Sequence, residues 1–164
     1  MEISAVSHPF PPLFDENSKI LILGSFPSVK SREENFFYGH PQNRFWRVLA
    51  RLYGSEVPKT VEQKKAFLLA NRIALWDVIA SCEIEGSSDS SIKNVLPNDL
   101  SLIFEKAKIE RIFINGKTAK KYYDKYLRSA NPNLPDALCL PSTSPANAAY
   151  STDLLCEAWS VIVK

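Results

Sequence analysis

The chain has 164 residues, of which 45% are apolar and 23% are charged, so it can form one domain with a substantial core. Its net charge of +2 is only mildly basic, so any contact with DNA must come from a local arrangement of side chains. No apolar run approaches the roughly 20 residues that cross a membrane, and the first residues lack the basic and apolar regions of a signal peptide. We therefore expect a single domain over residues 1–164, located in the cytoplasm.

The metal-binding residue types are sparse. The three cysteines, Cys82, Cys139 and Cys156, are odd in number and widely spaced, and no CxxC pair exists. They indicate neither a disulfide framework nor a zinc site, and the two histidines, His8 and His40, are too few for a histidine-rich site. We expect no metal, no cofactor and a monomer, with the cysteines as buried or inert thiols.

Short apolar runs alternate along the chain with helical patterns. A proline-rich segment, Ser7–Phe14, reads as an extended lead-in, and the serine-rich Glu85–Ser91 reads as a loop. Four apolar runs predict strands: Lys19–Gly24, which suits a strand buried on both faces, Ile73–Ile79, Arg111–Gly116 and Ala137–Leu140. Apolar residues at helical spacing predict helices that start near Phe45, cover Val61–Ala70, include Leu100 with Asn98 as its cap, and contain Ala119 and Leu155.

This alternation predicts an α/β protein, a three-layer α/β/α fold around a central, mostly parallel four-stranded sheet. In such folds, ligands bind at the carboxyl ends of the strands. We therefore expect the functional residues in Ser25–Ser28, in the segment that starts at Asp77, in Asn115–Thr118 and in Pro141–Asn147.

Three stretches in these positions carry a resemblance to a known family. They are Gly24–Ser28, Phe37–Trp46 and Leu140–Asn147. In this order and spacing they resemble the hypoxanthine-DNA (deoxyinosine) glycosylases of the uracil-DNA glycosylase superfamily. The second stretch, which is the most specific, is also similar to one in the mismatch-specific uracil glycosylases. The resemblance covers about residues 19 to 160.

Two positions depart from the other branches of that superfamily. Phe26 stands where those branches carry an Asn or Asp that handles the attacking water, and Leu140 stands where they usually carry His or Asn. The hypoxanthine branch shows the same losses. The resemblance therefore implies a DNA repair enzyme that flips a deaminated base, hypoxanthine or also uracil, out of DNA and hydrolyses its N-glycosidic bond, which leaves an abasic site.

Two alternatives stay open: a uracil or mismatch-specific glycosylase, and a catalytically inactive relative that binds nucleic acid. Nucleotide kinases and dehydrogenases are disfavoured, since GxxxxGK[ST] and GxGxxG are absent. A lyase would need a lysine nucleophile, and no lysine lies in the three stretches, the nearest being Lys30. The expected enzyme is thus a monofunctional glycosylase, and its expected partner is DNA with a deaminated base.

The second stretch supplies two candidate catalytic residues. The resemblance implies that this branch uses an asparagine outside the first motif, and Asn43 could accept a hydrogen bond from the attacking water. Its alternative role is to cap a helix that begins at Arg44. His40 could protonate the departing base, or could be a structural histidine before Pro41.

Four residues are candidates for binding the base. Phe26 could be a stacking platform or a core aromatic, and Gly24 and Ser25 belong to the same turn. Asp77 accepts hydrogen bonds only, so it could select hypoxanthine, which has an N1–H, over adenine, which has none. It could also be an ordinary strand-end aspartate, and Asp89 is a weaker alternative for the same role.

The last two strand ends supply candidate contacts to DNA phosphates. Ser142, Thr143 and Ser144 lie between two prolines, where hydroxyl and backbone N–H groups suit phosphate binding, although a plain turn has the same composition. Gly116 and Lys117 precede a helix, whose N-terminus can bind an anion or can be an ordinary helix start. Three arginines are further candidates, although each alone is more typical of a solvated surface: Arg32, Arg44 and Arg47.

Overall fold

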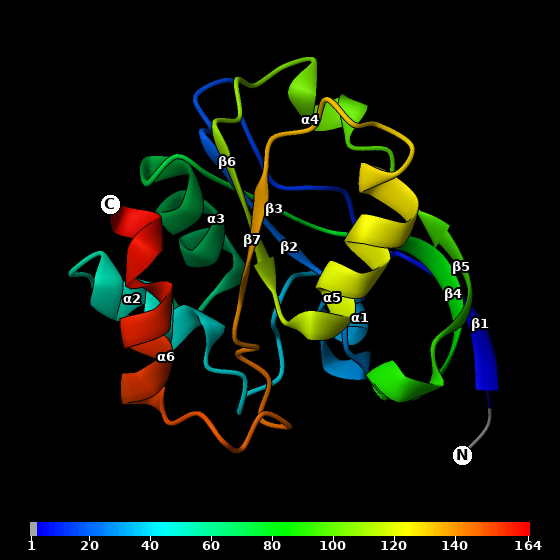
Figure 1. The fold of residues 1–164 in the computed structure, drawn as a ribbon. Helices are drawn as coiled ribbons and strands as arrows, with labels where there is room; N and C mark the ends of the chain where they lie inside the picture. Colours follow the sequence, from blue (N-terminus) through cyan, green and yellow to red (C-terminus); the bar gives the residue numbers. More distant parts are fainter. Residues whose placement is uncertain (1–2) are drawn as a thin grey trace.

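The centre of the fold is a four-stranded parallel sheet, seen in a computed structural model that describes residues 3–164 (Figure 1). The strand order is β3-β2-β6-β7. These strands are β2 (Ile20–Gly24), β3 (Ile73–Asp77), β6 (Arg111–Asn115) and β7 (Ala137–Leu140). Every residue of β2 and β3 is buried, because the sheet is covered on both faces. The predicted parallel sheet is confirmed.

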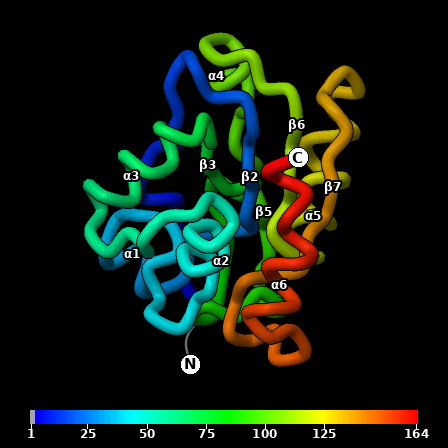
Figure 2. Tube along the Cα trace, turned by 90° about the vertical axis from the view of Figure 1, so that its left-hand side faces the viewer, coloured from blue at the N-terminus to red at the C-terminus, as the bar shows by residue number. Residues whose placement is uncertain are grey.

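Helices complete the layers. On one side lie α2 (Phe45–Leu52), α3 (Val61–Ala70) and α6 (Thr152–Trp159), which stand in front of the sheet in Figure 2. On the other side lies α5 (Lys117–Tyr122), which continues into the π-helical η2 (Tyr123–Arg128) (Figure 1). The shorter helices are α1 (Val29–Glu34), η1 (Asp89–Ser91), α4 (Ser101–Phe104) and η3 (Ser160–Val163). Within residues 3–164 no helix is long and apolar enough to span a membrane.

A second, antiparallel sheet was not predicted. It has the order β1-β4-β5 and consists of β1 (Ile3–Ser7), β4 (Ile79–Glu85) and β5 (Lys93–Pro97). The predicted strand Ile73–Ile79 is therefore wrong at its end, because the chain leaves the central sheet after Asp77 and enters the small sheet at Ile79. The predicted loop also starts too early, since β4 extends to Glu85.

The lead-in after β1 runs against the outer edge of β3. Leu13 forms an antiparallel bridge with Leu75, and the His8 N–H donates to the Ala80 carbonyl at 2.7 Å. The segment predicted as an extended lead-in is therefore extended and fixed to the sheet. It brings His8, which no sequence motif indicated, next to the end of β3.

The prediction of Asn98 as a helix cap is wrong. Its buried side chain donates to the carbonyls of Asp77 and Ile79 at 2.8 and 3.2 Å, so it fastens the junction of the two sheets. Near the start of α4, the Ser101 N–H instead donates a hydrogen bond to the Asp99 carboxylate at 3.0 Å.

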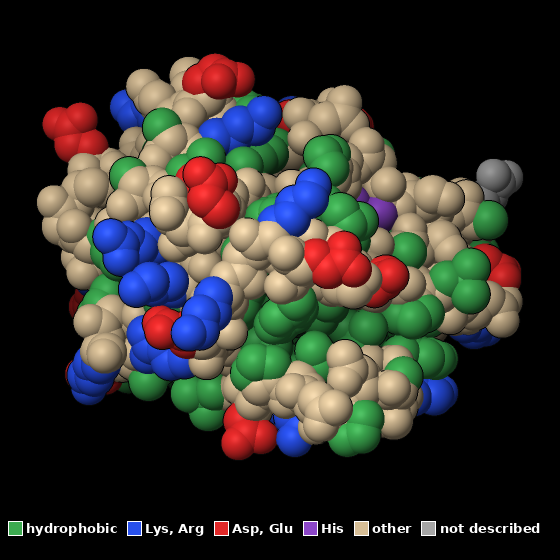
Figure 3. Space-filling view, turned by 90° about the horizontal axis from the view of Figure 1, so that it is seen from above, with side chains coloured by type: hydrophobic (Ala, Val, Ile, Leu, Met, Phe, Trp, Pro, Cys, Tyr) green, Lys and Arg blue, Asp and Glu red, His purple; other side chains and the backbone are tan. Residues whose placement is uncertain are grey.

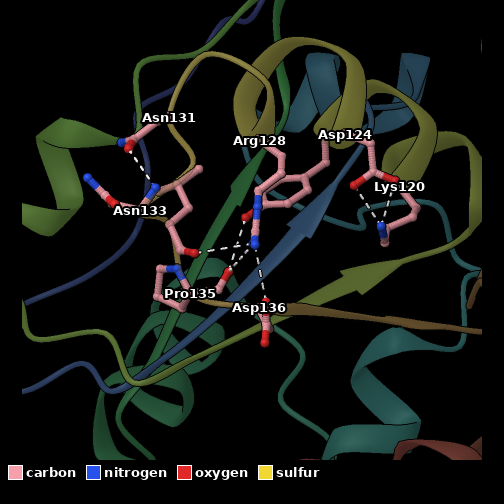
Figure 4. A network of polar contacts seen from close by, with 9 residues as sticks. Lys120, Asp124, Arg128, Asn131, Asn133, Pro135 and Asp136 are labelled. Carbon is pink, nitrogen blue, oxygen red and sulfur yellow. Dashed lines mark hydrogen bonds and ion pairs between the residues drawn. The ribbon is translucent and has the colours of Figure 1, made fainter.

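The end of the molecule with α4 carries a separate hollow of about 330 Å³. Figure 3 looks onto this end and shows apolar side chains gathered among charged ones. The apolar lining includes Leu100, Phe104, Tyr126, Leu127, Leu134 and Pro135. Next to it, the Arg128 guanidinium donates to the carbonyls of Leu134 and Pro135 at 3.2 and 3.4 Å and pairs with Asp136 at 3.3 Å (Figure 4). These contacts fix the connection that leads from η2 into β7.

Candidate active site

A cavity of about 350 Å³ opens at the carboxyl ends of the parallel strands, the lower end of the sheet in Figure 1. The expected convergence of the strand-end segments is observed, since Phe26, Asn43, Asp77 and Ser142 all line this cavity. His40 and the other predicted residues of the first and third stretches also line it: Gly24, Ser25, Thr143 and Ser144. A cavity of this size is typical of a small-molecule or base pocket.

Gly116 and Lys117 do not line the cavity, although their segment does through Asn115. Gly116 has a φ of +98°, and a Cβ there would lie 3.1 Å from the Cβ of Ser142. Glycine at this position therefore allows the β6 and β7 ends to approach each other. Lys117 is exposed beside the cavity.

Asp77 lies on the floor of the cavity, and its partner is His8. The His8 Nε2 lies 2.8 Å from the Asp77 Oδ2, and the two side chains are only 4% and 5% exposed. The other carboxylate oxygen, Oδ1, faces Gly24, where a Cβ would lie 2.5 Å from it. Any side chain larger than hydrogen at position 24 would therefore displace Asp77.

Tyr38 forms a further part of the floor that sequence reasoning missed. Its ring stacks on Phe45, with the ring centroids 4.1 Å apart, and its buried hydroxyl makes no hydrogen bond of normal geometry within residues 3–164, although the Asn115 side chain lies near enough to lower its pKa. A Cβ on Gly24 would lie 2.9 Å from this hydroxyl, so the hydroxyl and Asp77 meet at the same glycine. Burial, with a contribution from the negative charge of Asp77, raises the pKa of Tyr38 far above its ordinary value. The hydroxyl is therefore a proton-bearing donor at neutral pH.

Asn43 is held by a chain of three polar side chains. The Asn115 amide donates to the Thr143 hydroxyl at 3.0 Å, which donates to the Asn43 Oδ1 at 2.8 Å. The same Oδ1 accepts the Phe45 N–H at 2.9 Å, at the first residue of α2; the N-cap position itself is Arg44, so the prediction of Asn43 as the N-cap is wrong by one residue. Since two donors occupy the oxygen, the amide nitrogen is the group left to act in the cavity. This differs from the expected role of the oxygen as the acceptor for water.

Thr143 has a different role from the one expected. It is 0% exposed, its hydroxyl is occupied as described, and its N–H donates to the Asn115 Oδ1 at 3.0 Å. In this structure the Thr143 hydroxyl is therefore bound to Asn43 and Asn115, and its contact with a phosphate stays a prediction. Ser142 and Ser144 are only partly buried, and each hydroxyl accepts a backbone N–H two residues ahead at 3.1 Å. Both hydroxyl protons remain available for a ligand.

Arg44 fixes the 142–150 segment. Its guanidinium donates to the carbonyls of Ser144 and Asn147 at 3.0 Å each, and to that of Tyr150. The suggested phosphate contact of Arg44 is therefore replaced by a structural one. Trp159 fastens the start of the same segment, because its indole N–H donates to the Pro141 carbonyl at 2.9 Å.

Replacing Arg44 with alanine is expected to lower the free energy of unfolding by about 2 kcal/mol, because three carbonyls lose a charged donor. Urea unfolding measures this change. The matched control is Arg47→Ala one turn later, where the exposed guanidinium makes only long contacts of 3.4 and 3.5 Å. Equal destabilisation by the two variants would contradict this role of Arg44.

His40, from the second stretch, and Phe26, from the first, differ in their exposure. His40 is exposed at the cavity rim, and its Nδ1 accepts the Gln42 N–H at 3.1 Å, which leaves Nε2 free. Phe26 is 8% exposed, and the Arg32 guanidinium lies over its ring at 5.6 Å from the centroid. Arg32 also donates to the Gly86 carbonyl at 2.7 Å, so it packs on the protein rather than projecting toward solvent.

Asp89 brings a second carboxylate to the cavity rim, from η1. The Ser25 hydroxyl donates to its Oδ1 at 3.3 Å. Desolvation raises the pKa of Asp89 above its ordinary value; the Ser25 hydrogen bond lowers it and the nearby charge of Asp77 raises it. Among residues 3–164, no group of three or more His, Cys, Asp or Glu side chains is arranged to hold a metal ion.

Comparisons with known proteins agree with this geometry. A family model described as the uracil DNA glycosylase superfamily matches residues 11–162. A curated relative from Methanosarcina acetivorans, named hypoxanthine DNA glycosylase, is 38% identical over 157 residues, which cover 94% of this chain and 96% of the relative. A relative of the same name from Methanosarcina barkeri is 38% identical over 115 residues, which cover 69% and 73%.

A solved structure has the same fold. It is a solution NMR structure of a protein from Methanosarcina acetivorans, described in its title as a candidate uracil DNA glycosylase. It is 37% identical, has a TM-score of 0.80, and the match covers 97% of this chain and 96% of that one. Since the family match over residues 11–162 includes the whole central sheet and the cavity-lining segments, the chain belongs to the uracil DNA glycosylase superfamily.

Proposed function

We propose that the protein is a monofunctional DNA glycosylase that removes hypoxanthine, the deamination product of adenine, and leaves an abasic site. The observation that carries this proposal is the carboxylate of Asp77 on the cavity floor, with one oxygen bound by His8 and the other directed at Gly24. The names of the two Methanosarcina relatives support the same substrate. Action as a monomer in the cytoplasm, without a metal or cofactor, stays a prediction.

Asp77 suits a base with a hydrogen-bond donor on its edge. Hypoxanthine carries N1–H, which a carboxylate oxygen can accept, whereas adenine presents a lone pair at N1 that a carboxylate repels. Phe26 and Tyr38 line the same cavity and offer aromatic surface to a base that has left the stack. Ser25 and Gly24 let the backbone of the first turn approach the ligand.

Catalysis requires donors near the base, because the base departs as an anion while positive charge develops on the sugar. The amide nitrogen of Asn43 is free to donate to the departing base or to hold the water, and His40 can supply a proton to the base. No lysine lines the cavity among the described residues, so water rather than an amine is the proposed nucleophile.

The proposed contacts to DNA phosphates come from Ser142 and Ser144 on the cavity side and from Gly116 and Lys117 beside it. The two serines keep a free hydroxyl proton each, and Lys117 is exposed. Contacts of this kind hold the DNA in register without reading its sequence.

The proposed function is tested by an abasic-site cleavage assay. Duplex oligonucleotides that carry one hypoxanthine, uracil, xanthine or adenine are incubated with the protein and then treated with alkali, which cleaves at abasic sites. We expect cleavage at hypoxanthine and none at adenine. Cleavage at uracil alone would identify a uracil glycosylase, and binding without any cleavage would identify an inactive relative; either result would contradict the proposal.

A further inference from the structure

His8 lies beneath the proposed base pocket and outside all three stretches that carry the family resemblance. Its Nε2 is 2.8 Å from the Asp77 Oδ2, although 69 residues separate the two in sequence. Both side chains are almost completely buried. This hydrogen bond therefore holds one oxygen of the Asp77 carboxylate in place.

The His8 ring is held on several sides. Three phenylalanine rings surround it, with centroid distances of 4.5 Å to Phe10, 6.0 Å to Phe26 and 6.1 Å to Phe37. The backbone at His8 is fixed by its bond to the Ala80 carbonyl. A ring packed in this way keeps its direction, so Asp77 loses little further freedom when a base binds.

The hydrogen-bond network favours one protonation state of this ring. Its Nδ1 is buried and has no partner among residues 3–164, so a proton on Nδ1 would be a buried donor without an acceptor. A neutral ring with its proton on Nε2 donates to Asp77 and leaves Nδ1 as a buried acceptor, so no N–H group is left unpaired. The Asp77 Oδ2 is then occupied, whereas Oδ1 is left as an acceptor beside Gly24.

We propose that His8 is a positioning residue for base selection, which fixes Asp77 so that Oδ1 accepts the N1–H of a 6-oxopurine. This inference rests on the proposed function, in which Asp77 reads the base. Without His8, Oδ2 is buried and unpaired, and the carboxyl group escapes this cost only by rotating or by taking up a proton. Rotation moves Oδ1 away from the N1–H of the base. Protonation turns the carboxyl group into a donor, which can bind the N1 of adenine.

The test is a double-mutant cycle read by single-turnover release of hypoxanthine. His8→Ala is expected to slow release on the order of 10- to 100-fold, the value of a hydrogen bond to a charged group. His8→Gln, which can place an N–H near the position of Nε2, is expected to restore most of the rate. The double variant His8→Ala/Asp77→Asn should be no slower than Asp77→Asn alone, because His8 acts through the carboxylate.

One control separates base selection from a general loss of structure. Affinity for DNA with a tetrahydrofuran abasic-site analogue should be unchanged in His8→Ala, since no base is present to be read. If His8→Ala slows release by the same factor in both backgrounds, or if His8→Gln is as slow as His8→Ala, the inference is overturned.

A measurement without substrate covers the case in which the proposed function itself fails. If the wild-type protein releases no hypoxanthine, nitrogen-15 NMR of the His8 ring still reports on the pair. We expect a proton on Nε2 in the wild type and a changed Nε2 resonance in Asp77→Asn. A ring with a bare Nε2 and a protonated Nδ1 would overturn the inference whatever the substrate.

Discussion

Replacing Asn43 with alanine is expected to lower the single-turnover rate of base release on the order of 10²–10³-fold, while the affinity for DNA changes little. The reason is the geometry of its amide group. The Phe45 N–H and the Thr143 hydroxyl hold the oxygen, so the nitrogen remains as a donor in the cavity. A donor that acts on charge developing in the transition state changes the rate much more than it changes binding. Rapid-quench measurement with excess protein gives the rate, and a binding titration gives the affinity.

The control for this prediction is Asn43→Asp. An aspartate keeps an oxygen for the Phe45 N–H and the Thr143 hydroxyl, so it preserves these two hydrogen bonds, whose loss in the alanine variant costs about 1 kcal/mol of folding free energy. It lacks the N–H group, however, and we expect it to be nearly as slow as alanine. A fast aspartate variant would contradict the donor role and would favour an oxygen that orients water. A fast alanine variant would reduce Asn43 to a helix cap.

The second large effect is expected at Asp77. The His8 N–H should hold the oxygen of an asparagine at this position, which turns the new amide N–H group toward Gly24 and the base. A donor then faces the N1–H of hypoxanthine, so Asp77→Asn should slow hypoxanthine release on the order of 100-fold. The same donor matches N1 of adenine. Inhibition by the free bases, measured side by side, should therefore shift from hypoxanthine toward adenine.

Asp89→Asn is the matched control, because Asp89 is the other carboxylate that lines the cavity. Its partner is Ser25 at the rim, and it does not touch His8 in the described contacts. We expect a smaller loss of hypoxanthine release and no shift toward adenine. If Asp89→Asn has the larger effect, Asp89 reads the base and the assignment to Asp77 is wrong.

The central sheet could be predicted because its strands are short apolar runs, of which β2 and β3 are buried on both faces, and such a run can be recognised from neighbouring residues alone. The small sheet could not. Its β1 strand is almost entirely exposed. Its β4 strand begins at Ile79, with a single residue between it and the end of β3 at Asp77. Residues 73–79 form one largely apolar run, and its pattern does not indicate the residue at which the chain passes from one sheet to the other.

The site residues that directly follow strands could be predicted from the sequence. Contacts between segments that are distant in sequence could not. The positions of Phe26 and Asp77 in the cavity follow from the parallel topology, whereas Asn43, which follows no strand, was a candidate through the family resemblance. The contact between His8 and Asp77 depends on the path of the lead-in. That path is set by backbone pairing with β3 and β4, and no local sequence pattern predicts this pairing. The burial of Thr143 between two accessible serines depends on Asn115 and Asn43, which are likewise distant in sequence.

The passage of the chain from the central sheet into the small one has an evolutionary consequence. Asp77, the last residue of β3, and His8 lie at that junction, whereas Asn43, Thr143 and Asn115 are joined to one another by hydrogen bonds elsewhere in the cavity wall. Under the proposed roles of Asp77 and Asn43, recognition of the base and hydrolysis of the bond would depend on separate sets of contacts. Substitutions in the lead-in and the small sheet can redirect the enzyme to a new damaged base while the hydrolytic groups stay in place, so substrate range can diverge faster than chemistry.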